Sequence, residues 1–166
     1  YDNLKMQCMV LGLPDDERIE KTLDIVGLGY LLKDKKHVSN FSLGMRQRLG
    51  IAMALLGEPE FLILDEPMNG LDPAGIVEVR ELILKLNRER NITFLISSHI
   101  LTELSLVATK YGIISKGHII KEITAAELQQ ELAKTTNITV DKPEALTELL
   151  GTLVNKDAIS YIPDGI

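Results

Sequence analysis

Apolar residues recur along the first third of the chain at the spacing of helices. Residues 15–26 place apolar side chains on one face, and the pattern stops at Gly27, which predicts a first helix. Residues 30–41 are rich in lysine and predict a loop. A second helix is predicted to begin at Ser42, a favourable N-cap, and to end at Gly57.

Two short apolar runs, 61–64 and 92–96, have a different pattern and predict strands buried on both faces. Between them, Asp72 supplies an N-cap and Pro73 the first position of a third helix. A strand, a helix and a second strand in succession form a βαβ unit, and its two strands run parallel. The fold class is therefore α/β.

The remainder of the chain predicts shorter elements. A helix is expected over 100–110, and a capping box at Thr124 and Glu127 opens another. The other expected elements are strands over 111–115, 118–123, 138–140 and 158–162, and a helix over 143–150. The strands over 138–140 and 158–162 and the helix over 143–150 form a small C-terminal α+β appendage.

Composition narrows the class of protein. The length of 166 residues suits one domain with a small appendage, and the single cysteine favours a reducing compartment. A net charge of −6 argues against nucleic acid as the main partner. No apolar run approaches the roughly 20 residues that cross a bilayer, so we expect no direct membrane insertion and any membrane role to come through a partner.

Chemistry concentrates where the two predicted strands end. Asp65 and Glu66 follow the first strand, and His99 follows the second. Because the carboxyl ends of parallel strands meet at one edge, we expect these side chains to be neighbours. Two successive carboxylates suit Mg²⁺ with a phosphate ligand, one serving the metal and the other water. The alternatives are two solvated acids in a turn and a structural histidine.

A second candidate site is the stretch FSLGMRQRLG, residues 41–50, which opens the second predicted helix. Residues 33–48 carry a local excess of four positive charges in an acidic chain. Ser42 offers a hydroxyl and Gly44 leaves the backbone N–H groups accessible, so the helix start suits a phosphate. The alternative is a capped helix with a solvated basic face.

Taken in order, these pieces closely resemble the ATP-binding cassette (ABC) ATPase family over residues 1–123. The matching stretches are Ser42, Leu43, Gly44 and Met45 at the signature sequence, usually LSGGQ; residues 62–66 at Walker B; Asn69, Gly70, Leu71 and Asp72 at the D-loop; and His99 at the switch histidine. The Ser-Leu-Gly-Met form followed by an appendage is similar to bacterial exporter ATPases of the bacitracin and lantibiotic immunity type.

The resemblance implies a P-loop NTPase fold with a helical signature subdomain (1–57), part of the α/β core (58–134) and the appendage (135–166). In the family, ATP and Mg²⁺ are sandwiched between two subunits arranged head to tail. The roles it implies are Mg²⁺ binding, usually through water, by Asp65; catalysis by Glu66 as general base and by His99 at the γ-phosphate; nucleotide contact in trans by Ser42, Leu43, Gly44 and Met45; and interface contacts by Asn69, Gly70, Leu71 and Asp72.

The implied function is ATP hydrolysis coupled to export, in a subunit held on the cytoplasmic face of the membrane by a permease. Two alternatives stay open: a soluble, non-transport ABC ATPase, and a non-enzymatic partner that supplies only the signature face. The family also requires a P-loop of the form G-x-x-x-x-G-K-[ST], which the 166 residues lack. We therefore expect the chain to be the C-terminal part of a nucleotide-binding subunit, and to be inactive alone.

Overall fold

The computed structural model describes residues 1–13, 16–34 and 36–133, together with 146 and 150. The chain divides into two compact units, Tyr1–Tyr111 and Gly112–Ile166, and each is described by itself. The three elements predicted for the appendage, over 138–140, 143–150 and 158–162, lie outside the described residues except for two positions within the predicted helix. The predicted boundaries after 57 and 134 stay predictions.

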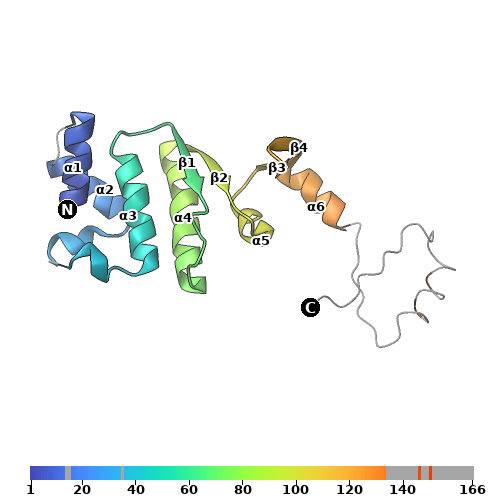
Figure 1. Cartoon of the computed structure of the whole chain (residues 1–166), viewed down its shortest axis with the longest axis horizontal. Coiled ribbons are helices and arrows are strands. Elements are labelled where there is room, and N and C mark those ends of the chain that lie inside the picture. The colour runs from blue at the N-terminus through green and yellow to red at the C-terminus, as the bar shows by residue number, and fades with distance from the viewer. Residues whose placement is uncertain (14–15, 35, 134–145, 147–149, 151–166) are drawn as a thin grey trace. The chain divides into compact units, whose positions relative to one another are not determined.

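Three helices open the first unit: α1 (Asp2–Leu11), α2 (Asp16–Ile25) and α3 (Leu43–Leu55). They contact one another and form a small helical layer (Figure 1). Helices α2 and α3 confirm the two predicted ones. The predicted loop between them contains two short 3₁₀ turns, η1 (Gly29–Leu32) and η2 (Val38–Asn40).

The sequence pattern does not predict α1, and its side chains explain why. Leu4 and Cys8 are fully buried, one turn apart, against the neighbouring helices. Met6, Met9 and Val10 are nevertheless exposed on the same helix. Apolar residues on both sides leave no single apolar stripe, which is the feature that identifies a helix from sequence.

The predicted βαβ unit is confirmed. Strand β1 (Phe61–Asp65), helix α4 (Pro73–Arg90) and strand β2 (Thr93–Ser97) follow in order, and the two strands pair in parallel. Helix α4 lies alongside the strands (Figure 1). The parallel register sets Phe61 opposite Thr93 and Asp65 opposite Ser97, so the two carboxyl ends finish level with each other.

The prediction that both faces of these strands are buried is wrong for the described structure. Successive residues of a strand point to opposite sides. Leu62 is buried and Leu64 packs against the core that the helices share. On the other side Phe61, Ile63 and Leu95 are 51%, 68% and 56% exposed. Among the described residues, the helices cover only one face of this two-stranded sheet.

The helix predicted over 100–110 is shorter than expected. Only α5 (Leu101–Leu104) is helical, and the chain then continues through backbone turns to Ala108. No helix of the described residues combines the length and the apolar character required to cross a membrane.

The second unit contains a hairpin and a helix, close to the prediction. Strands β3 (Lys110–Ser115), whose first two residues belong to the first unit, and β4 (His118–Thr124) pair into a two-stranded sheet. The turn between them, Lys116-Gly117, has φ values of 49° and 79°, as a tight hairpin requires. Helix α6 (Ala125–Ala133) follows directly.

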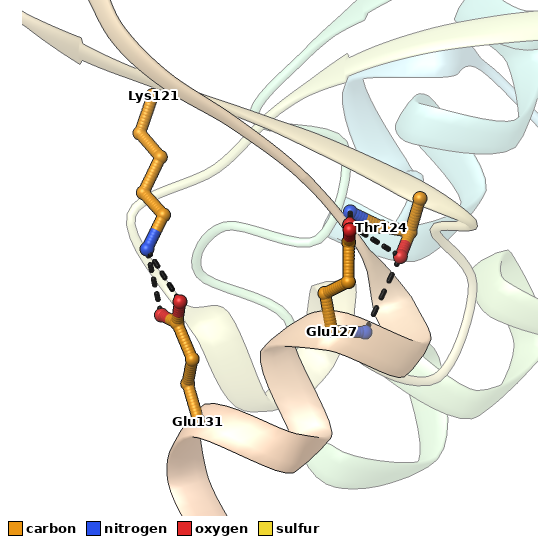
Figure 2. Close-up of polar contacts among 4 residues, drawn as sticks. All are labelled: Lys121, Thr124, Glu127 and Glu131. Atoms are coloured by element: carbon orange, nitrogen blue, oxygen red, sulfur yellow. Dashed lines mark hydrogen bonds and ion pairs between the residues drawn. The ribbon is translucent and has the colours of Figure 1, made fainter.

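The predicted capping box at the start of α6 is confirmed (Figure 2). The Thr124 N–H and Oγ1–H both donate to Glu127 Oε2, at 2.9 and 2.7 Å, and the Glu127 N–H donates to Thr124 Oγ1 at 3.2 Å. Glu131 lies one turn further along α6, and both of its carboxylate oxygens pair with Lys121 Nζ of β4, at 2.8 and 2.7 Å. These contacts join α6 to the end of β4.

The capping box predicts a measurable proton-binding effect. Hydrogen bonds from the backbone N–H and then the side chain of Thr124 lower the pKa of Glu127. A lowered pKa stabilises the folded unit above the unfolded-state pKa, and this stabilisation is lost as the pH falls through the folded-state pKa. We expect Thr124→Ala to raise the pKa of Glu127 partway toward its ordinary value, as measured by NMR titration of the side-chain carboxyl.

The control is Lys121→Met, because Lys121 is the smallest of the causes acting on Glu127. It should move the pKa of Glu127 less than Thr124→Ala does. An unchanged pKa in Thr124→Ala would contradict the assignment of the side-chain hydrogen bond.

Candidate functional site

The carboxyl ends of β1 and β2 bring Asp65 and Ser97 together. Ser97 Oγ–H donates to Asp65 Oδ1 at 2.5 Å, and the two residues are also partners in the strand register. Both side chains lie on the face of the sheet that the described helices leave open. The Asp65 carboxylate is therefore held by a hydroxyl at the edge where parallel sheets bind ligands.

Glu66 is positioned by its backbone as well as by its side chain. Its φ is 46°, in the left-handed region that residues other than glycine rarely adopt. The Glu66 N–H donates to both the Oγ and the carbonyl oxygen of Ser97, at 3.0 and 3.2 Å. This conformation ends the strand abruptly and turns the chain toward Pro67, which is buried.

His99 meets Glu66 across the edge of the sheet. Its Nδ1–H donates to Glu66 Oε1 at 2.8 Å, although the two residues are 33 positions apart in sequence. The Glu66 side chain is 32% exposed and the His99 ring 63%, so both remain open to a ligand. The prediction that parallel strands make Glu66 and His99 neighbours is confirmed, whereas their catalytic roles stay predictions.

The donor set at this edge fits Mg²⁺ that arrives with a phosphate. No cluster of three or more His, Cys, Asp or Glu side chains suited to a metal ion occurs among the described residues. Mg²⁺ does not require such a cage, because it is usually bound by one or two carboxylates, waters and substrate phosphates. Asp65 and Glu66 supply two carboxylates in succession, of which Asp65 is the one anchored by a hydroxyl.

The second candidate site is the start of α3. Ser42 is the N-cap, and its Oγ accepts a hydrogen bond from the Met45 N–H at 3.2 Å. A hydroxyl has one proton in addition to its acceptor lone pairs, so capping leaves the Ser42 proton available to a ligand. Leu43 is 40% exposed, whereas the Met45 side chain is buried in the core. A contact of the Met45 side chain with a nucleotide would require that side chain to move.

The residues predicted as the D-loop lie directly against this helix start. Gly70 has a φ of 73°, and a Cβ added to it would lie 3.2 Å from Leu43 Cδ2. Leu71 Cδ2 similarly lies 3.8 Å from the position of a Cβ on Gly44. The two predicted segments are therefore in contact within one chain. Glycine is favoured at position 70 by its backbone conformation, and a Cβ there would require Leu43 to shift by a few tenths of an ångström.

The ends of the D-loop are held by local hydrogen bonds. At its start, the Asn69 N–H donates to the Glu66 carbonyl oxygen at 3.1 Å, which joins the D-loop to the acidic edge. At its end, Asp72 caps α4 as predicted, with Oδ1 accepting from the Gly75 N–H at 3.1 Å. The Asp72 residue itself is exposed, and so are Asn69 and Gly70.

The two arginines of α3 are used within the chain. Arg46 Nη1 donates to the Phe41 carbonyl oxygen at 2.7 Å. The Arg48 side chain, only 16% exposed, pairs through Nη2 with Glu78 Oε2 at 3.3 Å, and its Nη1 reaches the carbonyl oxygens of Val26 and Gly27. Arg48 therefore ties α3 to the end of α2 and to α4, so the predicted solvated basic face does not describe it.

The described residues thus contain two separate groups of predicted site residues. The first group, Asp65, Glu66 and His99, lies at the edge of the sheet. The second group consists of the helix start, residues 42–45, and the D-loop, residues 69–72. In the described part of the chain, no hydrogen bond or ion pair joins the side chains of the two groups.

Sequence reasoning missed Ser97. Its position two residues before His99 at the end of a predicted strand was the available indication.

Comparison with known proteins places these features in a family. A family model described as "ABC transporter" matches residues 1–69. The chain is 42% identical over 151 residues to the bacitracin transport ATP-binding protein BcrA of Enterococcus faecalis, covering 90% of this chain and 48% of the relative. It is 48% identical over 134 residues to the lantibiotic transport ATP-binding protein SrtF of Streptococcus pyogenes, covering 80% and 57%. The chain spans about half the length of the curated relatives it matches.

Solved structures agree with the fold. The ADP conformation of an ATP-binding cassette of an ABC transporter matches 73% of this chain and 48% of its own, with a TM-score of 0.63 and 27% identity. The cbiO1 protein of Clostridium perfringens, part of an ABC transporter complex, matches 86% of this chain and 51% of its own, with a TM-score of 0.62 and 27% identity. The α/β fold is thus that of ABC ATPase cassettes, and residues 1–69 of the chain match the ABC transporter family.

Proposed function

We propose that this chain is the part of an ABC exporter's nucleotide-binding subunit that carries Walker B, the D-loop, the switch histidine and the signature face. The observation that carries the proposal is the contact of His99 with Glu66 beside the hydroxyl-anchored Asp65, at the carboxyl edge of parallel strands. The similarity of this chain to the bacitracin and lantibiotic transport proteins supports an antimicrobial peptide or drug as the exported substrate.

At the proposed hydrolytic site, Glu66 acts as general base toward the water that attacks the γ-phosphate of ATP. His99 contacts that phosphate and orients the water, and the hydrogen bond at 2.8 Å holds the imidazole beside the carboxylate. A positioned general base contributes on the order of 10²–10⁴ in rate.

The resemblance further implies Mg²⁺, for which Asp65 would be the protein ligand, usually through water. When bound, Mg²⁺ would neutralise charge on the phosphates. Ser97 keeps the Asp65 carboxylate at the edge of the sheet by the contact at 2.5 Å.

The proposed second role acts in trans on the nucleotide of a partner subunit. Ser42 has a hydroxyl proton left after capping α3, and Gly44 lies beside it at the helix N-terminus, where partial positive charge favours phosphate. The exposed D-loop residues Asn69, Gly70 and Asp72 would line the interface between two subunits arranged head to tail. Met45 contributes less, because its side chain is buried.

We infer that the complete subunit works on the cytoplasmic face of the membrane, held there by a transmembrane permease. The transport function of BcrA and SrtF favours an exporter over a soluble, non-transport ATPase. The pairing of Glu66 with His99 argues against a non-enzymatic partner, which would need neither residue.

Turnover of Mg-ATP tests this proposal. The complete subunit should hydrolyse ATP, whereas residues 1–166 alone should not, because they contain no P-loop to hold the phosphates. Release of phosphate by the purified chain above the rate of a Glu66→Gln control would contradict the proposal for the chain alone. An inactive complete subunit, purified with its permease, would contradict the enzymatic function itself.

A further inference from the structure

The Ser97 hydroxyl contacts both residues of the acidic pair. It donates to Asp65 Oδ1 at 2.5 Å and accepts from the Glu66 N–H at 3.0 Å. A hydroxyl has one proton and two lone pairs. The hydroxyl proton of Ser97 therefore goes to Asp65, and one lone pair of its Oγ accepts the hydrogen bond from Glu66.

The Glu66 backbone depends on the same residue. With a φ of 46°, Glu66 occupies a conformation that persists only where its surroundings hold it. Its N–H points at Ser97, sharing its hydrogen between the Oγ and the carbonyl oxygen. Two residues beyond Ser97, His99 reaches the Glu66 carboxylate. Ser97 thus links the end of β1, which carries Asp65 and Glu66, to the segment after β2, which carries His99.

We propose that Ser97 is a positioning residue for this site, an inference that rests on the proposed ATPase function. Its hydroxyl fixes one oxygen of Asp65, so that the carboxylate presents its other oxygen to the metal or to a water bound to it. In the described part of the chain, Ser97 is the residue that hydrogen-bonds this carboxylate. The same hydroxyl fixes the backbone turn at Glu66.

The expected consequence is a change in metal dependence. Groups that hold a metal ligand by hydrogen bonding typically contribute about 10-fold to 100-fold in metal affinity or activity. Removing the Ser97 hydroxyl should therefore weaken Mg²⁺ binding at the nucleotide site. It should leave the capped helix of the signature face unchanged, because the described hydrogen bonds of the Ser97 hydroxyl go to Asp65 and Glu66, whereas the cap is the bond between Ser42 and Met45.

The experiment compares Ser97→Ala, Ser97→Thr and Ser98→Ala in the complete subunit that carries this chain. Ser98→Ala is a matched control, since the Ser98 Oγ accepts from the Ile100 N–H and makes no hydrogen bond to Asp65 or Glu66. The readout is the Mg²⁺ concentration that gives half-maximal dimerisation in a saturating, hydrolysis-resistant ATP analogue. Thermal melting without nucleotide reports on the fold.

We expect Ser97→Ala to raise the half-maximal Mg²⁺ concentration about tenfold. Ser97→Thr keeps the hydroxyl in a β-branched side chain that strands accept, so it should restore most of the wild-type dependence. Ser98→Ala should match the wild type. An unchanged Mg²⁺ dependence in Ser97→Ala, or an equal change in the threonine variant, would overturn the proposal.

Failure of the proposed function would look different. A wild-type subunit that neither dimerises with the analogue and Mg²⁺ nor hydrolyses ATP would contradict the proposed function and the inference together. A wild type that does both, with Ser97→Ala indistinguishable from it, would overturn the inference alone. If Ser97→Ala does not fold, a threonine variant that folds but shows a shifted Mg²⁺ dependence would overturn it as well.

Discussion

Glu66→Gln is expected to lower the kcat of the complete subunit by about 10²–10⁴ while leaving ATP-dependent dimerisation intact. Glutamine keeps an oxygen that accepts the hydrogen bond from His99, so the contact at 2.8 Å can persist. It cannot take a proton from water, and the general base is therefore lost. Steady-state ATPase assays give kcat, and size-exclusion chromatography with ATP and Mg²⁺ gives the dimer.

The control for this substitution is Glu60→Gln, just before the start of the same strand. Glu60 contributes its backbone carbonyl oxygen to the Thr93 N–H, which the substitution preserves, and it lies away from the carboxyl edge. It should leave kcat within about twofold, since exposed substitutions away from special features change little. Loss of the dimer together with activity in Glu66→Gln would argue against a role for Glu66 as base.

Ser42→Asp should strongly weaken the nucleotide contact of the signature face without unfolding it. Aspartate is as good an N-cap as serine, so it can accept the hydrogen bond from the Met45 N–H. It replaces a hydroxyl proton by a negative charge facing a phosphate, and like charges across an interface cost several kcal/mol. We expect ATP-dependent dimerisation to weaken by about 100-fold or more, because each ~1.4 kcal/mol is a factor of ten, as measured by light scattering at increasing ATP.

Ser42→Asn separates charge from capping. Asparagine also caps well, and it keeps N–H donors for a phosphate. Its dimerisation should stay within about threefold of the wild type, because the N–H donor is retained. The melting temperatures of both variants should agree with that of the wild type. Equal weakening of dimerisation in the two variants would contradict the prediction that the negative charge at position 42 repels the phosphate.

Much of the acidic edge could be predicted from sequence, because it depends on strand direction alone. Two buried-strand patterns joined by a helix imply parallel pairing, and parallel pairing puts Glu66 and His99 at the same edge. The contact between Ser97 and Asp65 could not be predicted in this way. It depends on the exact register, and a slip by one residue would turn the Ser97 side chain to the other face.

Packing across long separations explains the other differences. The excess of positive charge over residues 33–48 predicted a phosphate site, yet Arg48, which is part of that charge, has as its partners the backbone of Val26 and Gly27 and the side chain of Glu78. Such contacts follow from how three helices pack, which no local pattern encodes. Among the described residues, the strands predicted as buried on both faces are covered on one face only. An apolar run alone does not reveal which elements cover a strand.

We propose that one chain serves two different nucleotides, through Glu66 at its own site and through Ser42 at its partner's. Mixed dimers of the complete subunit test this directly, using Glu66→Gln and Ser42→Asp. With the two changes on opposite subunits, both lesions fall in one site, and ATPase activity should equal that of a mixed dimer carrying either change alone.

With both changes on one subunit and a wild-type partner, the lesions fall in different sites, and activity should drop at least about tenfold further because neither site is complete. The measurement is ATP turnover by dimers purified through two different affinity tags. Equal activity in the two arrangements, or higher activity when both changes share a subunit, would contradict the account.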